Sequence, residues 1–267
     1  MRWSTSVLRT PSAVFIGVLI AAALAAAAVS RYAPTAMDKT AVLTVPSWRH
    51  LMGTDQFGRD ILSRLLFGAR VALLVGIAAT VVSAVFGVPL GLWAGFRGGP
   101  ADAVAMRGVD TLLAIPPVIL AMALVAVTGP GSVNAGIAVA VVGLPQFARI
   151  ARAGTLAQRR MEYVEAAVAA GAGDAWIIFR VIMRNVLSPV LVQLPIGVAR
   201  AILLEASLSF LGLGTQPPHP SWGLMISESR EYMYTAPWYG IFPGAAIALT
   251  VLALNNVSDH LRSLWRV

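Results

Sequence analysis

One long run of uncharged, mostly apolar residues sets the strongest limit on the fold. Residues 71–95 contain no charged side chain in 25 consecutive positions. A stretch of about 20 apolar residues is long enough to cross the hydrocarbon core of a bilayer as an α-helix. In lipid, only helices and closed barrels satisfy every backbone polar group. The run therefore predicts a membrane-spanning helix.

The composition extends this prediction to the whole chain. Of its 267 residues, 58% are hydrophobic and only 12% are charged, whereas soluble domains are about a quarter charged. Lipid must therefore surround much of the chain, and we expect an all-α integral membrane protein. Together with residues 71–95, five more apolar segments predict six transmembrane helices: residues 13–29, 111–127, 135–148, 186–204 and 238–257.

The first of these segments has two interpretations. Arg2 and Arg9 precede it and it ends in small residues, as in a secretory signal peptide. We expect a retained helix instead, because the sequence that follows does not read as a soluble mature protein. Six spans then place both termini on the same side of the membrane.

The basic residues indicate which side that is. With both termini in the cytoplasm, twelve of the 20 Lys and Arg residues fall in cytoplasmic segments and seven fall outside, while Arg200 lies within a span. Cytoplasmic connectors carry an excess of basic residues, so we expect cytoplasmic N- and C-termini. Residues 97–110 are expected to form a short polar turn, and residues 31–70 a polar outer connector.

Within that outer connector, residues 55–69 have the pattern of an amphipathic helix. We expect it to lie at the membrane interface, with packing against the rest of the protein as the alternative. Its polar face carries Arg59, Asp60, Ser63 and Arg64.

A basic stretch, residues 149–184, separates the fourth and fifth predicted spans. It holds six arginines and only three acids, so it is expected to face the cytoplasm. Apolar residues recur on both sides of Gly171 and Gly173. This pattern predicts a short helix, a glycine turn and a second helix that leads back into the membrane.

Several functions are excluded or disfavoured by what the sequence lacks. Lys39 is the only lysine and follows Asp38, so the chain has no Walker P-loop. It has no cysteine, three widely separated histidines, and neither a GxSxG nor an HExxH motif, which leaves a membrane enzyme as a weak alternative. Nucleic-acid binding is rejected because the arginines lie between apolar spans and do not form one basic face.

Arg200 and Glu205 are candidate pathway residues in the fifth predicted span. A charge inside a membrane is costly unless it is paired or faces water, so both could line a polar pathway. The alternative is a structural ion pair with an acid elsewhere in a complex. Prolines within the spans predict a packed bundle with bends; they are Pro116, Pro117, Pro145, Pro189, Pro195 and Pro243.

The basic stretch also carries a recognisable motif. Glu165-Ala166-Ala167, followed after three residues by Gly171, resembles the EAA signature of bacterial ABC importer permease subunits; Arg184 stands where that signature has a proline. The GTDQFGRD and SLSFLGLGTQPPHPSWG runs most resemble the C-type subunit of the dipeptide/oligopeptide/nickel permease family. Four segments carry this resemblance: residues 50–73, 110–131, 205–226 and 236–262.

The resemblance implies a type I ABC importer permease fold in a bacterial inner membrane. It implies three regions: residues 1–68, with a cytoplasmic tail, the first helix and the outer amphipathic segment; residues 69–260, a five-helix permease domain with a coupling loop at about 153–184; and residues 261–267, a short cytoplasmic tail. Coupling helices in that loop would seat in a cytoplasmic ATPase. The implied coupling residues are Tyr163, Glu165, Ala166, Ala167, Gly171 and Asp174.

The function implied is that of a non-enzymatic permease subunit, forming half of the pathway of an ATP-driven importer. Di- or oligopeptides are the expected substrates, and nickel is the alternative within the same family. The implied partners are a second permease subunit, two ATPase subunits that bind ATP and Mg, an extracytoplasmic substrate-binding protein and the lipid bilayer. No cofactor and no metal are expected in this chain. A secondary transporter working alone is the competing interpretation.

Overall fold

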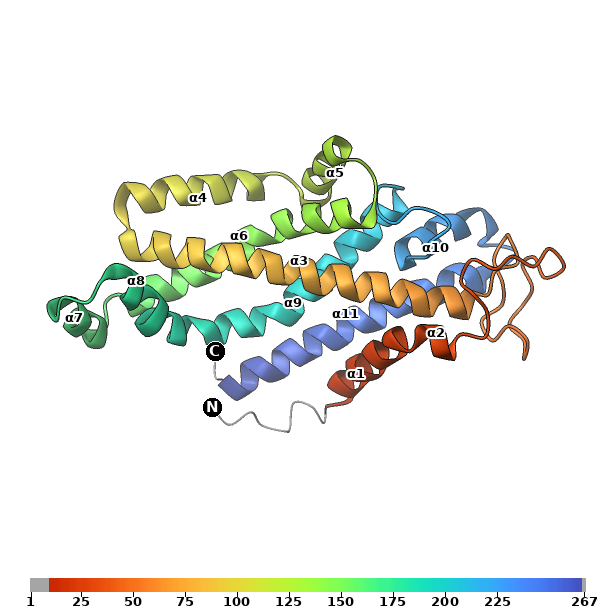
Figure 1. Ribbon diagram of the computed structural model, residues 1–267, viewed down its shortest axis with the longest axis horizontal. Coiled ribbons are helices and arrows are strands. Elements are labelled where there is room, and N and C mark those ends of the chain that lie inside the picture. Colours follow the sequence, from red (N-terminus) through yellow and green to blue (C-terminus); the bar gives the residue numbers. More distant parts are fainter. Residues whose placement is uncertain (1–9, 266–267) are drawn as a thin grey trace.

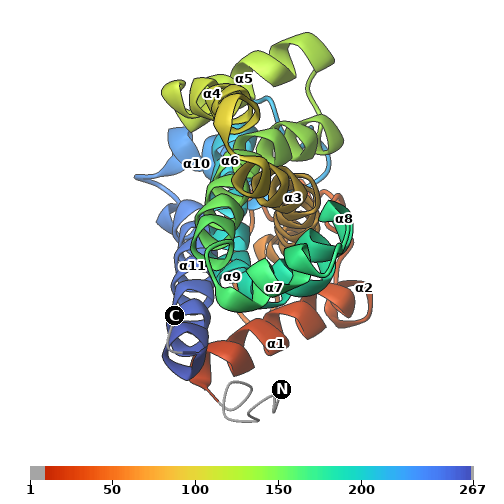
Figure 2. The ribbon, with the colours of Figure 1, turned by 90° about the vertical axis from the view of Figure 1, so that its left-hand side faces the viewer.

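Four long helices run side by side through the computed structural model, which describes residues 10–265 (Figure 1). They are α3 (Ile61–Arg97), α6 (Ser132–Gln158), α9 (Met183–Phe210) and α11 (Pro237–Trp265). Seen along the bundle, they form its centre, with α4 and α5 on one flank and α1 on the opposite flank (Figure 2). Residues 1–9 and 266–267, parts of the two predicted cytoplasmic tails, lie outside the described residues.

Shorter helices join and cover this bundle. The first, α1, packs against α11 and α3, while α10 packs against α9 and α11. Their bounds are α1 (Pro11–Leu24), α2 (Ala26–Val29), α4 (Gly99–Ala114), α5 (Pro117–Thr128), α7 (Glu162–Ala169), α8 (Asp174–Trp176), the π-helical η2 (Ile177–Ile182), α10 (Trp222–Ser229) and η3 (Arg230–Tyr232).

The described helices confirm the all-α membrane fold class. Four are long and apolar enough to cross a membrane, one of them Asp174–Phe210, which joins α8, η2 and α9. The α4 and α5 helices pass that test only together, and their axes differ by 94°. With 14 residues, α1 is shorter than a spanning helix requires. The count of six spans therefore stays a prediction.

Local sequence signals explain several helix ends. The side chains of Thr10, Asp60 and Ser221 each accept a hydrogen bond from a backbone N–H in the first turn of α1, α3 and α10. Such caps satisfy N–H groups that have no partner within the helix. At the other end of α3, Gly98 adopts φ 65° and stops the helix.

The most extensive helix contact in the bundle is between α3 and α6, and glycine lets these helices approach closely. Gly87, Gly91 and Gly95 recur every four residues and so share one face of α3. A Cβ atom on Gly91 would lie 2.1 Å from the carbonyl oxygen of Ala148, and one on Gly87 would lie 2.6 Å from that of Leu144. Small residues at this spacing let membrane helices approach closely.

We expect the Gly91→Ala substitution to destabilise the protein by about 1–3 kcal/mol, because the added methyl meets backbone that cannot move aside. Gly136→Ala is the matched control, since its Cβ would meet only Val75 at an ordinary 3.6 Å. Thermal unfolding in detergent measures both. Equal melting temperatures for the two variants would contradict the close α3–α6 contact.

Residues 55–69 do not form a separate interfacial helix; the alternative, packing against the rest of the protein, is confirmed. Helix α3 begins at Ile61 and continues without a break to Arg97. Most of the polar face assigned to that helix is not solvated: Arg59 and Arg64 are buried, with exposed fractions of 2% and 0%. Both arginines form ion pairs with Glu228, which stabilise their charges inside the protein. The polar face of the amphipathic pattern therefore packs against protein and not against a membrane surface.

Two other polar segments are more helical than predicted. The expected turn at residues 97–110 is mostly α4, whose first turn holds Pro100 and Asp102, both favoured at a helix N-terminus. The expected single span at residues 111–127 is broken where Pro116 and Pro117 interrupt the helix. Much of the basic stretch is also helical, because α6 continues to Gln158 and the helix leading to α9 starts at Asp174.

Candidate functional site

A short helix, α7, stands at one end of the bundle, opposite α10 (Figure 1). A short turn joins it to α6, and a second turn, at Gly171, joins it to α8. Gly171 has φ 78°, a conformation that glycine adopts at little cost. From Asp174 the chain is helical through η2 into α9. The predicted order of short helix, glycine turn and second helix is confirmed.

One buried side chain anchors α7 to the bundle. Val164 is 1% exposed and belongs to an apolar cluster with Ile177, Ile178 and Ile182. The outer face of α7 is open and carries mostly small side chains; its exposed residues include Glu165, Ala166, Val168 and Ala169. A partner surface can approach such a face closely.

Three of the candidate coupling residues contact this chain itself: Ala167 packs against the apolar cluster that holds Val164, and Tyr163 and Asp174 make polar contacts. The Tyr163 hydroxyl donates a hydrogen bond to the Gln158 side chain and accepts one, at 2.8 Å, from the Asn185 amide. Asp174 forms an ion pair of 3.2 Å with Arg97 at the end of α3. Both contacts hold the α7–α8 segment against the long helices. Glu165, Ala166 and Gly171 remain exposed on the outer side.

The arginines of the basic stretch find acids outside it. Arg149 pairs with Asp110 at 2.6 Å, and Arg152 donates two hydrogen bonds of 2.5 Å to Asp102. Both acids lie on α4. These ion pairs hold α4 against α6 near the end of the bundle that carries α7. The acids within residues 149–184 gave no indication of these partners.

A cavity of about 330 Å³ lies between α3, α5, α6 and α9. Its lining is largely apolar, with a few polar side chains from three helices: Thr80 and Ser83 of α3, Gln146 of α6, and Gln193, Arg200 and Ser207 of α9. The structure therefore places Arg200, which is exposed, on the lining of an open cavity. Neither glutamine was singled out from the sequence. Gln193 could have been, because it precedes Arg200 by seven residues and so lies on the same face of α9.

Glu205 lies elsewhere. It follows Arg200 by five residues, which turns it about 140° around the helix. Its side chain is fully buried, and one carboxylate oxygen accepts a hydrogen bond of 2.7 Å from Ser209. The Ser209 hydroxyl in turn accepts from the backbone N–H of Thr215. Glu205 thus supports the loop after α9, and it is not among the residues that line the cavity.

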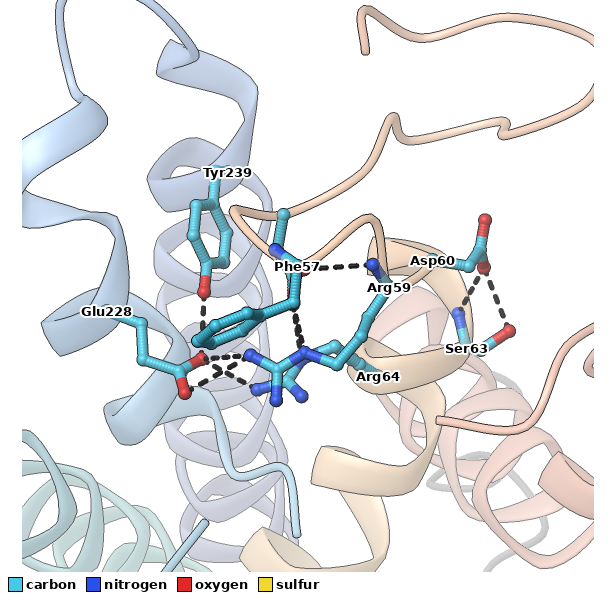
Figure 3. Close-up of polar contacts among 8 residues, drawn as sticks. Phe57, Arg59, Asp60, Ser63, Arg64, Glu228 and Tyr239 are labelled. Atoms are coloured by element: carbon cyan, nitrogen blue, oxygen red, sulfur yellow. Dashed lines mark hydrogen bonds and ion pairs between the residues drawn. The ribbon is translucent and has the colours of Figure 1, made fainter. Parts of the chain in front are cut away.

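A cluster of buried charges closes the opposite end of the bundle (Figure 3). Arg59 donates to Asp55 at 2.6 Å, and Arg64 donates to Glu228 at 2.7 Å. Glu228 also accepts from Arg59 at 3.2 Å and from the Tyr239 hydroxyl at 2.8 Å. These contacts join five residues from the segment before α3 and from α3, α10 and α11. We call Asp55, Arg59, Arg64, Glu228 and Tyr239 the outer polar cluster.

The charges of this cluster balance one another. Burial alone would lower the pKa of Arg59, but the carboxylates of Asp55 and Glu228 outweigh burial and hold that pKa above its ordinary value. Arg59 therefore stays charged although it is almost completely buried. Glu228 could not be assigned to this cluster from the sequence, because Arg59 and Arg64 lie more than 150 residues before it. Tyr239 joins the cluster only through Glu228.

Known proteins are similar to this chain in sequence and in fold. Residues 87–264 match the family described as the binding-protein-dependent transport system inner membrane component. The di/tripeptide transport system permease protein DppC of Pseudomonas aeruginosa is 42% identical over 254 residues, which cover 93% of this chain and 84% of that protein. The probable D,D-dipeptide transport system permease protein DdpC of Escherichia coli is 40% identical over 259 residues, covering 97% and 87%.

A solved structure supports the fold independently. A chain of the MetNI methionine ABC transporter, in an inward-facing conformation, superposes with a TM-score of 0.64 at 19% identity. The match covers 76% of this chain and 97% of that chain. At this identity the likeness shows the fold alone, and it confirms the type I ABC importer permease fold expected from the sequence. With the family match spanning well over half of its length, the chain belongs to the binding-protein-dependent transport system inner membrane components, the permease subunits of ABC importers.

Proposed function

We propose that this chain forms half of the translocation pathway of an ATP-driven peptide importer and is coupled to separate ATPase subunits through α7. One observation carries the proposal: α7 is joined on both sides to helices that line the Arg200 cavity. It follows α6 directly, and it leads through α8 and η2 into α9.

This connection suggests how force reaches the pathway. Val164 packs in the apolar cluster with Ile177 and Ile178, so α7 and η2 should move together. A partner that binds the exposed face of α7 would therefore displace both. This displacement tilts α6 and α9 relative to α3. Gln146, Gln193 and Arg200 lie on the two helices that would move. A switch of this kind needs contacts that differ between two states, and ATP-driven closure of the ATPases would supply them.

Peptides are the substrates that the relatives support. The proteins from Pseudomonas aeruginosa and Escherichia coli are named as di/tripeptide and D,D-dipeptide permeases, at 42% and 40% identity over nearly the whole chain. A largely apolar cavity with a few polar groups suits peptides of varied side chains. We propose di- or oligopeptides as the transported class.

The proposed partners follow from the same assignment. They are a second permease subunit, two ATPase subunits that hold ATP and Mg, and an extracytoplasmic binding protein. We place α7 and both termini in the cytoplasm of a bacterial cell, and the outer polar cluster on the opposite side of the inner membrane. The basic residues around α7, Arg159, Arg160, Arg180 and Arg184 among them, agree with the charge bias of cytoplasmic segments.

Reconstitution tests the proposal. The complete complex in proteoliposomes should import a labelled dipeptide only when ATP and the binding protein are present on their respective sides. A protonophore should leave this uptake unchanged. Import by the isolated chain without ATPase subunits, or uptake abolished by the protonophore while ATP persists, would instead identify a secondary transporter.

A further inference from the structure

The cavity is lined by a cation that has no counter-ion among residues 10–265. Arg200 lies well inside α9, and within residues 10–265 its guanidinium makes no hydrogen bond or ion pair. No acidic residue lines the cavity. Charged side chains inside a membrane are costly and normally pair or face a water-filled space. The arginine is therefore positioned to bind an anionic group that enters the cavity.

Helix α9 aligns further polar groups with it. Gln193, Arg200 and Ser207 recur every seven residues, so they share one face along about 21 Å of helix. All three line the cavity, and Gln146 joins them from α6. In the described part of the chain, the side chains of Gln146 and Gln193 make no hydrogen bond. Two free amides thus accompany the free guanidinium.

We infer that Arg200 binds the C-terminal carboxylate of a peptide in transit, while Gln146 and Gln193 bind its backbone amide groups. The planar fork of a guanidinium matches a carboxylate with two parallel hydrogen bonds. A glutamine amide both donates and accepts, as a peptide bond requires. The apolar lining from Leu113, Val118 and Phe147 receives the peptide side chains.

The orientation of the peptide follows from the same charges. The nearest acid along α9, Glu205, is buried away from the cavity and bound to Ser209. Among the described residues, the lining of this cavity therefore offers no carboxylate to the amino end of a peptide. The amino end would face water or the second permease subunit. This inference rests on the proposed function, since it requires peptides to pass through this cavity.

Photolabelling of the intact complex tests the assignment. The probe is the dipeptide alanyl-photoleucine, whose diazirine reacts on illumination, compared with the same dipeptide carrying a C-terminal amide. Labelled segments are identified by mass spectrometry after the complex is incubated with each probe at the same concentration, well below saturation. We expect the free acid to label α6 and α9 around the cavity about tenfold more than the amide, because hydrogen bonds to charged groups are the strong ones.

Variants of Arg200 separate carboxylate binding from a structural role. Arg200→Gln should bring the labelling ratio of acid to amide close to one, and Arg200→Lys, which keeps the charge without the fork, should give an intermediate ratio. Arg107→Gln is the control, an exposed arginine on α4 that does not line the cavity.

Two results would overturn the inference. One is an Arg200→Gln complex that keeps the tenfold preference for the acid. The other is a variant that loses labelling by both probes and no longer assembles, because Arg200 would then pair with an acid of another subunit. Dipeptide uptake by the unmodified complex is measured in parallel. If that uptake occurs while the labelling preference is absent, the carboxylate assignment fails and the peptide importer stands.

Discussion

Complexes carrying the Gly171→Asp substitution should insert into the membrane and lose substrate-stimulated transport. Gly171 lies in the exposed turn that follows α7, and a Cβ atom there would meet no other atom within 4 Å. Its φ of 78° strains any other residue, but aspartate tolerates this region better than most. The fold should therefore survive. The substitution adds a negative side chain beside α7, on the surface that we propose binds the ATPase.

The size of the effect follows from the position of this surface. A residue near the centre of a packed interface contributes about 2 kcal/mol or more, so the affinity for the ATPase should fall roughly 30-fold or more. Uptake and ATP hydrolysis in proteoliposomes measure the loss, and co-purification of the ATPase reports docking. Gly171→Ala is the control, because it has at least as much backbone strain without the charge. Normal uptake by Gly171→Asp would remove α7 from the coupling role.

Glu165→Lys tests the same surface through charge. Within residues 10–265 the Glu165 carboxylate makes no ion pair, so reversing its charge should cost the fold little. Glu162→Lys is the control, since both acids lie in the first turn of α7 and both favour the helix N-terminus. We expect the Glu165 variant to lose most uptake and the Glu162 variant to lose much less. Equal losses would point to the helix terminus and not to a partner contact.

The centres of the helices could be predicted from the sequence, but many of their ends could not. Apolar runs mark the spans because lipid requires them, and residues 71–95 do lie within one helix. The ends are polar, and their structure depends on partners far along the chain. Arg64 is buried only because Glu228 meets it, and Arg152 is held by Asp102 on α4. Local periodicity contains no information about these pairs.

The coupling segment was more predictable than the cavity. The glycine at position 171 and the flanking apolar residues determine a helix, a turn and a helix over a short range, so local sequence was sufficient. The cavity is assembled from α3, α5, α6 and α9, and only Arg200 was conspicuous. The contact of Gly91 with Ala148 had an available signal, because glycines every four residues indicate close helix packing.

We expect Arg64→Met to destabilise the protein by about 3–5 kcal/mol, because removing one member of a buried ion pair leaves an uncompensated charge. Arg64 is 0% exposed, and it faces both Glu228 at 2.7 Å and Asp55 at 3.5 Å. Methionine fills a similar volume, so the loss reports charge more than packing. The melting temperature of the purified complex measures the effect, and addition of Glu228→Gln should restore part of the stability.

The control and the functional consequence separate two roles of the outer polar cluster. Arg49→Met removes an exposed ion pair with Asp38, at 3.7 Å, and should cost at most about 1 kcal/mol. If Arg64→Met costs no more than this control, the cluster contributes no special stability. The cluster joins α3 to α10 and α11 at the end opposite α7 (Figure 3). Because that end is held, a pull on α7 should tilt α6 and α9 against a fixed α3, so Arg64→Met should also lower the uptake obtained per ATP hydrolysed.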